Sequence, residues 1–200
     1  MAKLPQPPIS SPMFLDESKT LTLAWSRWFQ AISREANDNR SKISDIDLSE
    51  DAVVDLTKGI DGSNDVYEID LIDVRMSSPN SALLFRASSE VGVVLEASNM
   101  YQYDHTFGSS GSSTAIELSL HDCNNIANYE LNGYIRIIKP FNSDRYKLIY
   151  WTLAYVDSSD NLQVIQGAGQ IRTLDALIAF RILPNAGVLT SGTIKFYSLQ

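Results

Sequence analysis

Residues 65–200 carry the feature that most constrains the fold, a long series of short apolar runs separated by turn residues. The runs are rich in Val, Ile, Leu and Tyr and often alternate with polar residues, which places one face of a strand in a core and the other in solvent. Such strands at roughly even spacing predict an all-β body, an antiparallel jelly-roll-like β-sandwich. We expect strands near residues 66–77, 82–88, 92–104, 114–121, 130–139, 146–156, 162–170, 173–182 and 190–199.

The first 16 residues predict an extended arm. Proline fixes φ, removes a hydrogen-bond donor and keeps the preceding residue extended, and this segment holds four prolines, Pro5, Pro7, Pro8 and Pro12. A solvated tail and a tether that orders on a partner both fit this composition. The adjacent large apolar residues from Met13 to Leu15, which include Phe14, favour the tether.

Residues 20–36 predict one short α-helix, with Thr20 or Thr22 able to cap its N-terminus. Its apolar residues recur at helical spacing and form one stripe, made of Leu21, Trp25, Trp28, Phe29 and Ile32. A single helix cannot hide two tryptophans from water. It either folds back onto the β-body or packs against its own copies or another protein, and the polar segment that follows favours the second arrangement.

Residues 37–64 begin with a polar linker and become acidic, with Asp and Glu loosely alternating with Ile, Leu and Val. The acidic part fits one or two short strands, or a three-chain stalk with its apolar residues turned inwards. We therefore divide the chain into an anchoring arm and helix (1–36), an acidic linker or stalk (37–64) and a β-sandwich domain (65–200).

Charge and hydropathy exclude several classes of protein. The net charge is −8 and no Lys/Arg cluster is present, which argues against binding to nucleic acid and to anionic membranes. No apolar run is long enough to span a bilayer, and the N-terminus lacks the apolar core of a signal peptide, so we expect synthesis in a cytoplasm and no membrane insertion.

No motif selects an active site, a metal site or a cofactor. The acidic run that starts at Asp45 resembles a calcium loop but has Glu50 at its sixth position and Leu56 at its twelfth. The two histidines and the single cysteine, Cys123, do not make up a zinc ligand set. We expect no metal, no cofactor and no enzymatic activity.

Aromatic residues are the remaining candidates for binding. Tyr101 and Tyr103 are two residues apart, so their side chains leave the same face of a strand, and His105 follows in the next loop. Exposed rings beside Asp, Asn and Ser are typical of sugar-stacking surfaces, so these three residues are candidate receptor or glycan contacts. The alternative is that they belong to the sandwich core or to a subunit interface.

The two ends of the chain resemble small virion proteins of tailed bacteriophages. The N-terminal match consists of Pro-Pro-Ile-Ser-Ser-Pro-Met-Phe-Leu-Asp and then Leu-Thr-Leu-Ala-Trp-Ser-Arg-Trp-Phe, as in their head-binding segments. The C-terminal match, to their last two strands, consists of Ala-Leu-Ile-Ala-Phe-Arg-Ile-Leu and Leu-Thr-Ser-Gly-Thr-Ile-Lys-Phe-Tyr. Ala186-Gly187-Val188 replaces the usual Gly-Asn-Ile, which leaves the subfamily open.

The resemblance implies a virion protein, made in the host cytoplasm, that assembles as a homotrimer and attaches to a tail or capsid protein through residues 1–36. Pro5 to Phe14, including Pro8, would form the arm, and the tryptophan helix would form the anchor. The first hypothesis is a tail fibre or adhesin that displays its sandwich to the host surface, with a surface glycan as a candidate receptor. The alternatives are a head fibre or capsid decoration protein, and a carbohydrate-binding module unrelated to phage.

Overall fold

The computed structural model describes residues 14–15, 20–21, 40–89, 94–97, 99–106, 108–120, 123, 125–127 and 129–200. The chain divides into two compact units, Met1–Ser41 and Lys42–Gln200. In the first unit, β1 (Phe14–Leu15) pairs antiparallel with β2 (Thr20–Leu21). The rest of the predicted helix lies outside the described residues.

The second unit is built from β-strands, and none of its described residues is helical. The strands are β3 (Arg40–Asp47), β4 (Val54–Leu56), β5 (Val66–Met76), β6 (Leu83–Ser88), β7 (Tyr101–His105), β8 (Gly108–Ser113), β9 (Ile116–Glu117), β10 (Leu131–Ile138), β11 (Lys147–Val156), β12 (Leu162–Ile171), β13 (Ala179–Pro184) and β14 (Leu189–Leu199).

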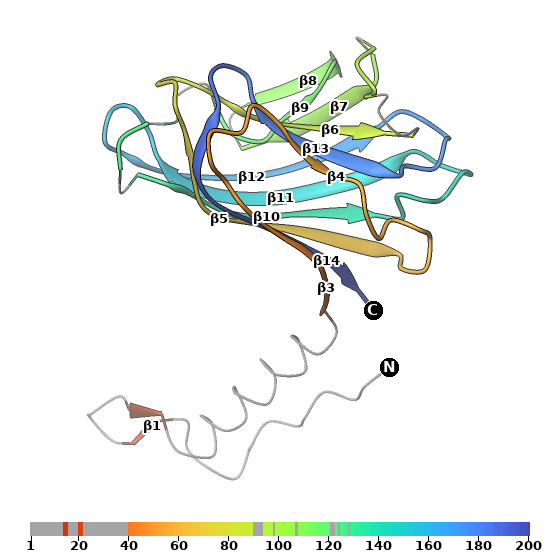
Figure 1. The fold of residues 1–200 in the computed structure, drawn as a ribbon, viewed down its shortest axis with the longest axis horizontal. Helices are drawn as coiled ribbons and strands as arrows, with labels where there is room; N and C mark the ends of the chain where they lie inside the picture. Colours follow the sequence, from red (N-terminus) through yellow and green to blue (C-terminus); the bar gives the residue numbers. More distant parts are fainter. Residues whose placement is uncertain are drawn as a thin grey trace. The chain divides into compact units, whose positions relative to one another are not determined.

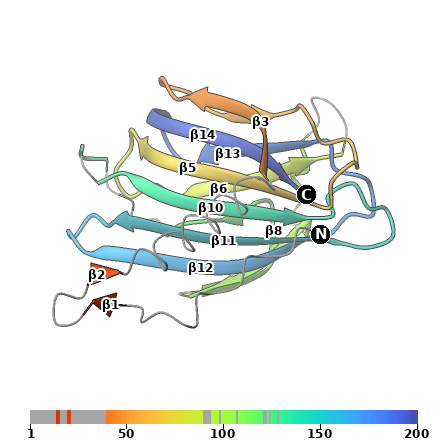
Figure 2. The ribbon, with the colours of Figure 1, turned by 90° about the horizontal axis from the view of Figure 1, so that it is seen from below.

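These strands form two antiparallel sheets that pack as a sandwich (Figure 1). The large sheet has eight strands in the order β3-β14-β5-β10-β11-β12-β7-β8, and the small sheet has four in the order β4-β13-β6-β9. Figure 2 shows most strands of the large sheet side by side, with the small sheet behind them. The prediction of an all-β sandwich body is confirmed.

The pairing of the strands is nested. Within the sandwich, β3 pairs with β14, β4 with β13, β5 with β10, and β6 with β9. Each of these pairs therefore lies inside the previous one along the sequence. Two further strand pairs interrupt this series. β7 and β8 follow β6, and β11 and β12 follow β10, and both pairs extend the large sheet because β12 pairs with β7.

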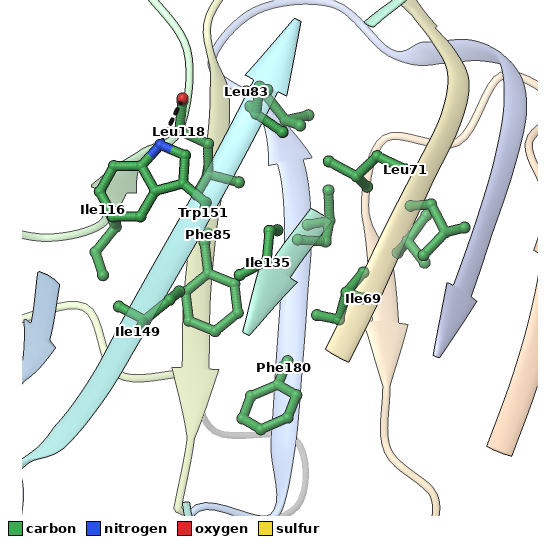
Figure 3. Close-up of a cluster of buried hydrophobic side chains, with 14 of the residues drawn as sticks. Ile69, Leu71, Leu83, Phe85, Ile116, Leu118, Ile135, Ile149, Trp151 and Phe180 are labelled. Atoms are coloured by element: carbon green, nitrogen blue, oxygen red, sulfur yellow. Dashed lines mark hydrogen bonds between the residues drawn. The ribbon is translucent and has the colours of Figure 1, made fainter. Parts of the chain in front are cut away.

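The inner faces of the two sheets meet in a continuous apolar core (Figure 3). Trp151 on β11 is 1% exposed, and its indole Nε1 donates a hydrogen bond of 2.9 Å to the Leu118 carbonyl, so its polar atom is satisfied inside the core. Gly167 lies directly opposite Trp151 on β12. A Cβ atom at Gly167 would lie only 2.1 Å from Cζ2 of Trp151, so the missing side chain makes room for the indole.

An aromatic cluster joins the two sheets. The ring of Phe180 on β13 lies 5.7 Å from that of Phe85 on the neighbouring β6. Across the sandwich it makes an edge contact with Phe196 on β14, with centroids 5.9 Å apart. Tyr67 on β5 stacks on Phe196 at 5.7 Å, so four rings from four strands form one unit of the core.

The sandwich starts earlier in the chain than the sequence indicates. Of the two interpretations of the acidic segment, short strands or a three-chain stalk, the structure shows the strands: β3 lies at the edge of the large sheet and β4 at the edge of the small sheet. The compact unit therefore begins at Lys42 rather than at residue 65. Ile43 and Ile46 pack against the core and Val54 and Leu56 are buried in it, so this segment contributes to the core of its own chain, while Val53 is exposed.

Several predicted strands are shorter or shifted. The strand predicted at 114–121 is reduced to β9, and the one predicted at 173–182 begins only at Ala179. Part of the predicted strand at 92–104 lies outside the described residues, and the strand begins at Tyr101. The backbone around Leu95 instead bonds to Ala87, with Leu95 N donating to its carbonyl at 2.9 Å.

Replacing Phe180 with Ala should lower the free energy of unfolding by about 3–5 kcal/mol, because it opens a cavity between the sheets where the ring now contacts three others. Urea denaturation measures the change. Phe141→Ala is the matched control, since that ring is 42% exposed. Equal losses in the two variants would contradict a core built around Phe180.

Candidate binding face

The outer face of the large sheet, which points away from the small sheet, carries the candidate site. Its side chains align in rows because residues directly opposite on antiparallel strands share a face. In the central row, Arg136 on β10 lies opposite Tyr150 on β11, and Tyr150 lies opposite Ala168 on β12. Ala168 in turn lies opposite Asp104 on β7, so the row runs from a cation, through a ring and a methyl group, to a carboxylate.

Large apolar side chains are exposed along the middle of this outer face. Tyr150 is 45% exposed, and its neighbours on β10, β11 and β12 are also well exposed, namely Tyr134, Leu148, Leu162 and Val164. Exposed apolar groups gathered on one face, beside polar ones, are typical of an interaction surface.

The side of this face towards β5 is held by an ion pair. Arg136 Nε donates to the carboxylate of Glu68, which is almost fully buried, and the guanidinium lies 5.1 Å from the ring centroid of Tyr134. The cation is thereby engaged on two sides. The guanidinium thus contacts both Glu68 and Tyr134 at the border of the exposed apolar side chains.

The side towards β7 contains a shallow hollow of about 470 Å³, which we call the β7–β12 hollow. Ala168 forms part of its floor, and its walls include Gln102, Asp104, Leu148 and Gln170. A small side chain between a tyrosine on one strand and an aspartate on the other leaves a depression in the sheet surface. The 470 Å³ volume of the hollow is within the usual range for a site that binds a small molecule.

The polar wall of the hollow is pre-organised. Gln102 Oε1 accepts a 2.6 Å hydrogen bond from Nε2 of Gln170 and a second bond from the guanidinium of Arg172. Arginine only donates, so it fixes which end of the Gln102 amide is oxygen. The amide nitrogen of Gln102 therefore points away from both partners.

Tyr101 lies in the core. It is completely buried, and its hydroxyl accepts a 2.9 Å hydrogen bond from Ala87 N on β6 and donates one of 2.9 Å to the Leu95 carbonyl. Burial raises the pKa of the Tyr101 phenol to about 12. The tyrosine thus ties β7 to the small sheet and presents no surface to a ligand.

Tyr103 shares the inner face with Tyr101, as the two-residue spacing predicts, and is only 7% exposed. Burial, together with the Glu117 carboxylate that accepts its hydroxyl, raises the pKa of Tyr103 to about 12. The half-buried His105 stacks on the Tyr103 ring with centroids 5.8 Å apart. Burial does not support Tyr101 as a receptor contact, whereas Tyr103, although largely buried, is one of the residues that line the β7–β12 hollow. The outward residues of β7 are Gln102 and Asp104.

The predicted anchor residues Pro8, Trp25, Trp28, Phe29 and Ile32 lie outside the described residues. Phe14 and Leu21 fall in the short pair β1–β2, where they are direct partners in the ladder.

The acidic segment that resembles a calcium loop uses its carboxylates locally. Asp45 pairs with Lys42 at 3.0 Å, Asp47 accepts from the Thr193 hydroxyl, and Asp51 accepts from the backbone of Ser49. Within the part of the chain that the structure describes, no group of three or more His, Cys, Asp or Glu side chains is arranged to hold a metal ion.

Cys123 is a buried free cysteine whose Sγ lies 3.1 Å from the hydroxyl of Ser119. Its backbone forms isolated bridges with Ser81 and with Asp157, so it joins loops at the end of the sandwich. A buried cysteine in such a place is a structural residue.

No protein-family model and no curated protein sequence matches this chain. The resemblance of its two ends to phage virion proteins therefore stays a hypothesis. Among the described residues, no helix has the length and apolar character needed to cross a membrane.

The sequence analysis chose residues of the correct strand, β7, but it chose the tyrosines of its inner face rather than the residues that point outwards. The available signal was the alternation of β7, since Gln102 and Asp104 must face outwards once the two tyrosines face inwards. Gln170 and Ala168 carried no comparable signal, because only the pairing of β12 with β7 brings them to the site.

Tyr101→Phe should lower the free energy of unfolding by about 1–3 kcal/mol, because Ala87 N and the Leu95 carbonyl lose their buried partner. Tyr67→Phe is the matched control. Tyr67 is equally buried, but its hydroxyl has no hydrogen-bond partner among the described residues, so the loss should be negligible.

The free energy of unfolding of Tyr101→Phe should also depend less on pH than that of the wild type. The pKa of Tyr101 is about 12 in the folded protein against 10.0 for a free phenol, so the folded state holds this proton more tightly. This difference in pKa adds to the free energy of unfolding below pH 10, and the added contribution is lost as the pH rises through 12. Urea titrations across this interval should show a shallower decline for Tyr101→Phe than for the wild type, and parallel declines would contradict the assignment.

Proposed function

We propose that this chain is a non-enzymatic structural virion protein of a tailed phage, a tail fibre or adhesin that attaches by its N-terminus and displays a β-sandwich to the host surface. The observation that carries the proposal is the contrast between the two faces of the large sheet. The inner face is sealed around Trp151 and the aromatic cluster, whereas the outer face exposes rings and aliphatic side chains beside a pre-organised polar hollow. A displayed binding module needs this combination of a rigid core and an open face.

We further propose that the sandwich is a jelly roll. The nested pairing supports this, because a jelly roll is a long β-ribbon folded over so that its ends and its middle both remain paired. The sheet orders β3-β14-β5-β10 and β4-β13-β6-β9 have the form expected of such a ribbon. The hairpins β7–β8 and β11–β12 are then insertions that widen one sheet, and they carry much of the outer face.

The virion assignment is supported by the resemblance of residues 7–29 and 176–197 to phage proteins. In the structure the C-terminal segment forms β13 and β14, which lie in the interior of opposite sheets. Residues 1–41 are a separate compact unit from the sandwich, as an attachment segment would be. A homotrimer is part of the proposal on the same resemblance, and the exposed apolar side chains of β10–β12 are compatible with self-association.

Deleting residues 1–36 should abolish incorporation of the protein into phage particles, because the anchor is removed. Incorporation is measured by quantifying the protein in purified particles by mass spectrometry. The double substitution of Trp25 and Trp28 by Ser should have the same effect, because the anchor loses its largest apolar groups.

The control is Phe141→Ser, which removes an exposed ring outside β10–β12 and should leave incorporation unchanged. Circular dichroism melting of the truncated chain shows whether residues 42–200, a compact unit with its own core, still unfold cooperatively. A folded, truncated chain that enters particles at the full-length level would contradict attachment through the N-terminus.

A further inference from the structure

The β7–β12 hollow has the chemistry of a sugar site. Its polar groups differ in kind: the amide of Gln102 presents a donor, since its oxygen is already engaged, whereas Gln170 donates to that oxygen and keeps its own carbonyl as an acceptor. Asp104 is exposed and accepts hydrogen bonds only. Donors and acceptors placed side by side match vicinal hydroxyl groups, each of which can donate and accept at once.

Apolar side chains stand beside these polar groups: Leu148 lines the hollow, and Tyr150 flanks it as the strand neighbour of Ala168. Tyr150 lies directly opposite Ala168 and is 45% exposed, and Leu148, opposite Gln170, is exposed to the same degree. Side chains in such directly opposed positions are within reach of one another. A flat ring beside a floor of one methyl group can cover the apolar face of a pyranose, while the sugar's hydroxyls reach the amides.

Charge selects among sugars. Asp104 lies in the hollow, and the chain carries a net charge of −8, so a carboxylated or phosphorylated sugar would be repelled. The nearby cation, Arg172, already donates to Gln102. A neutral ring is therefore favoured over an acidic one.

We propose that the β7–β12 hollow binds one neutral hexose or N-acetylhexosamine ring, with Tyr150 stacking on the sugar and Gln102, Gln170 and Asp104 bonding to its hydroxyls. The identification of this sugar as part of a host-surface glycan rests on the proposed function. The binding itself depends only on the geometry of the outer face.

The test is an NMR titration of the ¹⁵N-labelled full chain with glucose, galactose, mannose, N-acetylglucosamine and N-acetylgalactosamine. At least one sugar should shift the backbone amides of Gln102, Asp104, Ala168 and Gln170. Tyr150→Ala and Gln170→Ala should each weaken the binding of that sugar about tenfold. Ala168→Leu, which fills the floor from an exposed position, should abolish it.

Tyr134→Ala is the matched control, because Tyr134 is an exposed tyrosine on the same outer face that lies opposite Thr152 on β11, whereas Tyr150 lies opposite Ala168 of the hollow. Its affinity for the sugar should stay within about twofold of the wild type. Spectra of each variant without sugar show whether the fold is kept. The proposal is overturned if none of the five sugars shifts the hollow, or if Tyr134→Ala weakens binding as much as Tyr150→Ala.

The incorporation experiment separates this site from the proposed function. If the chain binds a sugar but is absent from particles, the proposed sugar site is supported and the protein is a carbohydrate-binding module unrelated to phage. If the chain enters particles but no sugar shifts its amide resonances, the proposed sugar site is contradicted while attachment to the virion is still supported.

Discussion

The burial of aromatic rings between two sheets is the constraint on which the rest of the structure depends. Phe85 and Phe180 from the small sheet meet Tyr67 and Phe196 from the large one, and all four are at most 1% exposed. Because side chains alternate along a strand, this contact fixes which residues of each strand face outwards. A slip of one residue in β5 or β14 would expose the rings and bury charges such as Asp70.

The outer face is a consequence of the same alternation. In β7, the inward tyrosines are held by the core, and Tyr101 is hydrogen-bonded across to β6, so the intervening Gln102 and Asp104 are held outwards. In β12, Gly167 faces inwards and makes room for Trp151, so its neighbour Ala168 faces outwards, where its small side chain forms the shallow point of the hollow. The requirements of the core therefore shape the hollow, and its polar groups sit on rigid strands rather than on loops.

The sequence was sufficient to predict what depends on local pattern. Alternation and turn residues located most strands, and they placed Tyr101 and Tyr103 on a common face. They did not show that this face is the inner one, because an apolar ring fits a core and a sugar site equally well. For the acidic segment the pattern allows short strands as well as a stalk, but it does not show that β3 and β4 join the edges of the two sheets, because this depends on their pairing with β14 and β13. The contact between Gln102 and Gln170 spans 68 residues and follows from the pairing of β7 with β12, which no local pattern encodes.

Electron microscopy of intact phage particles with a gold label at the C-terminus gives the most direct test of display on a virion. Gln200 is exposed and follows β14, so a label there should be accessible without disturbing the core. A tail fibre or adhesin predicts gold around the tail. Gold spread over the head would instead indicate a capsid decoration protein. Intact particles that carry no gold, from cells that produce the labelled chain, would contradict the virion assignment.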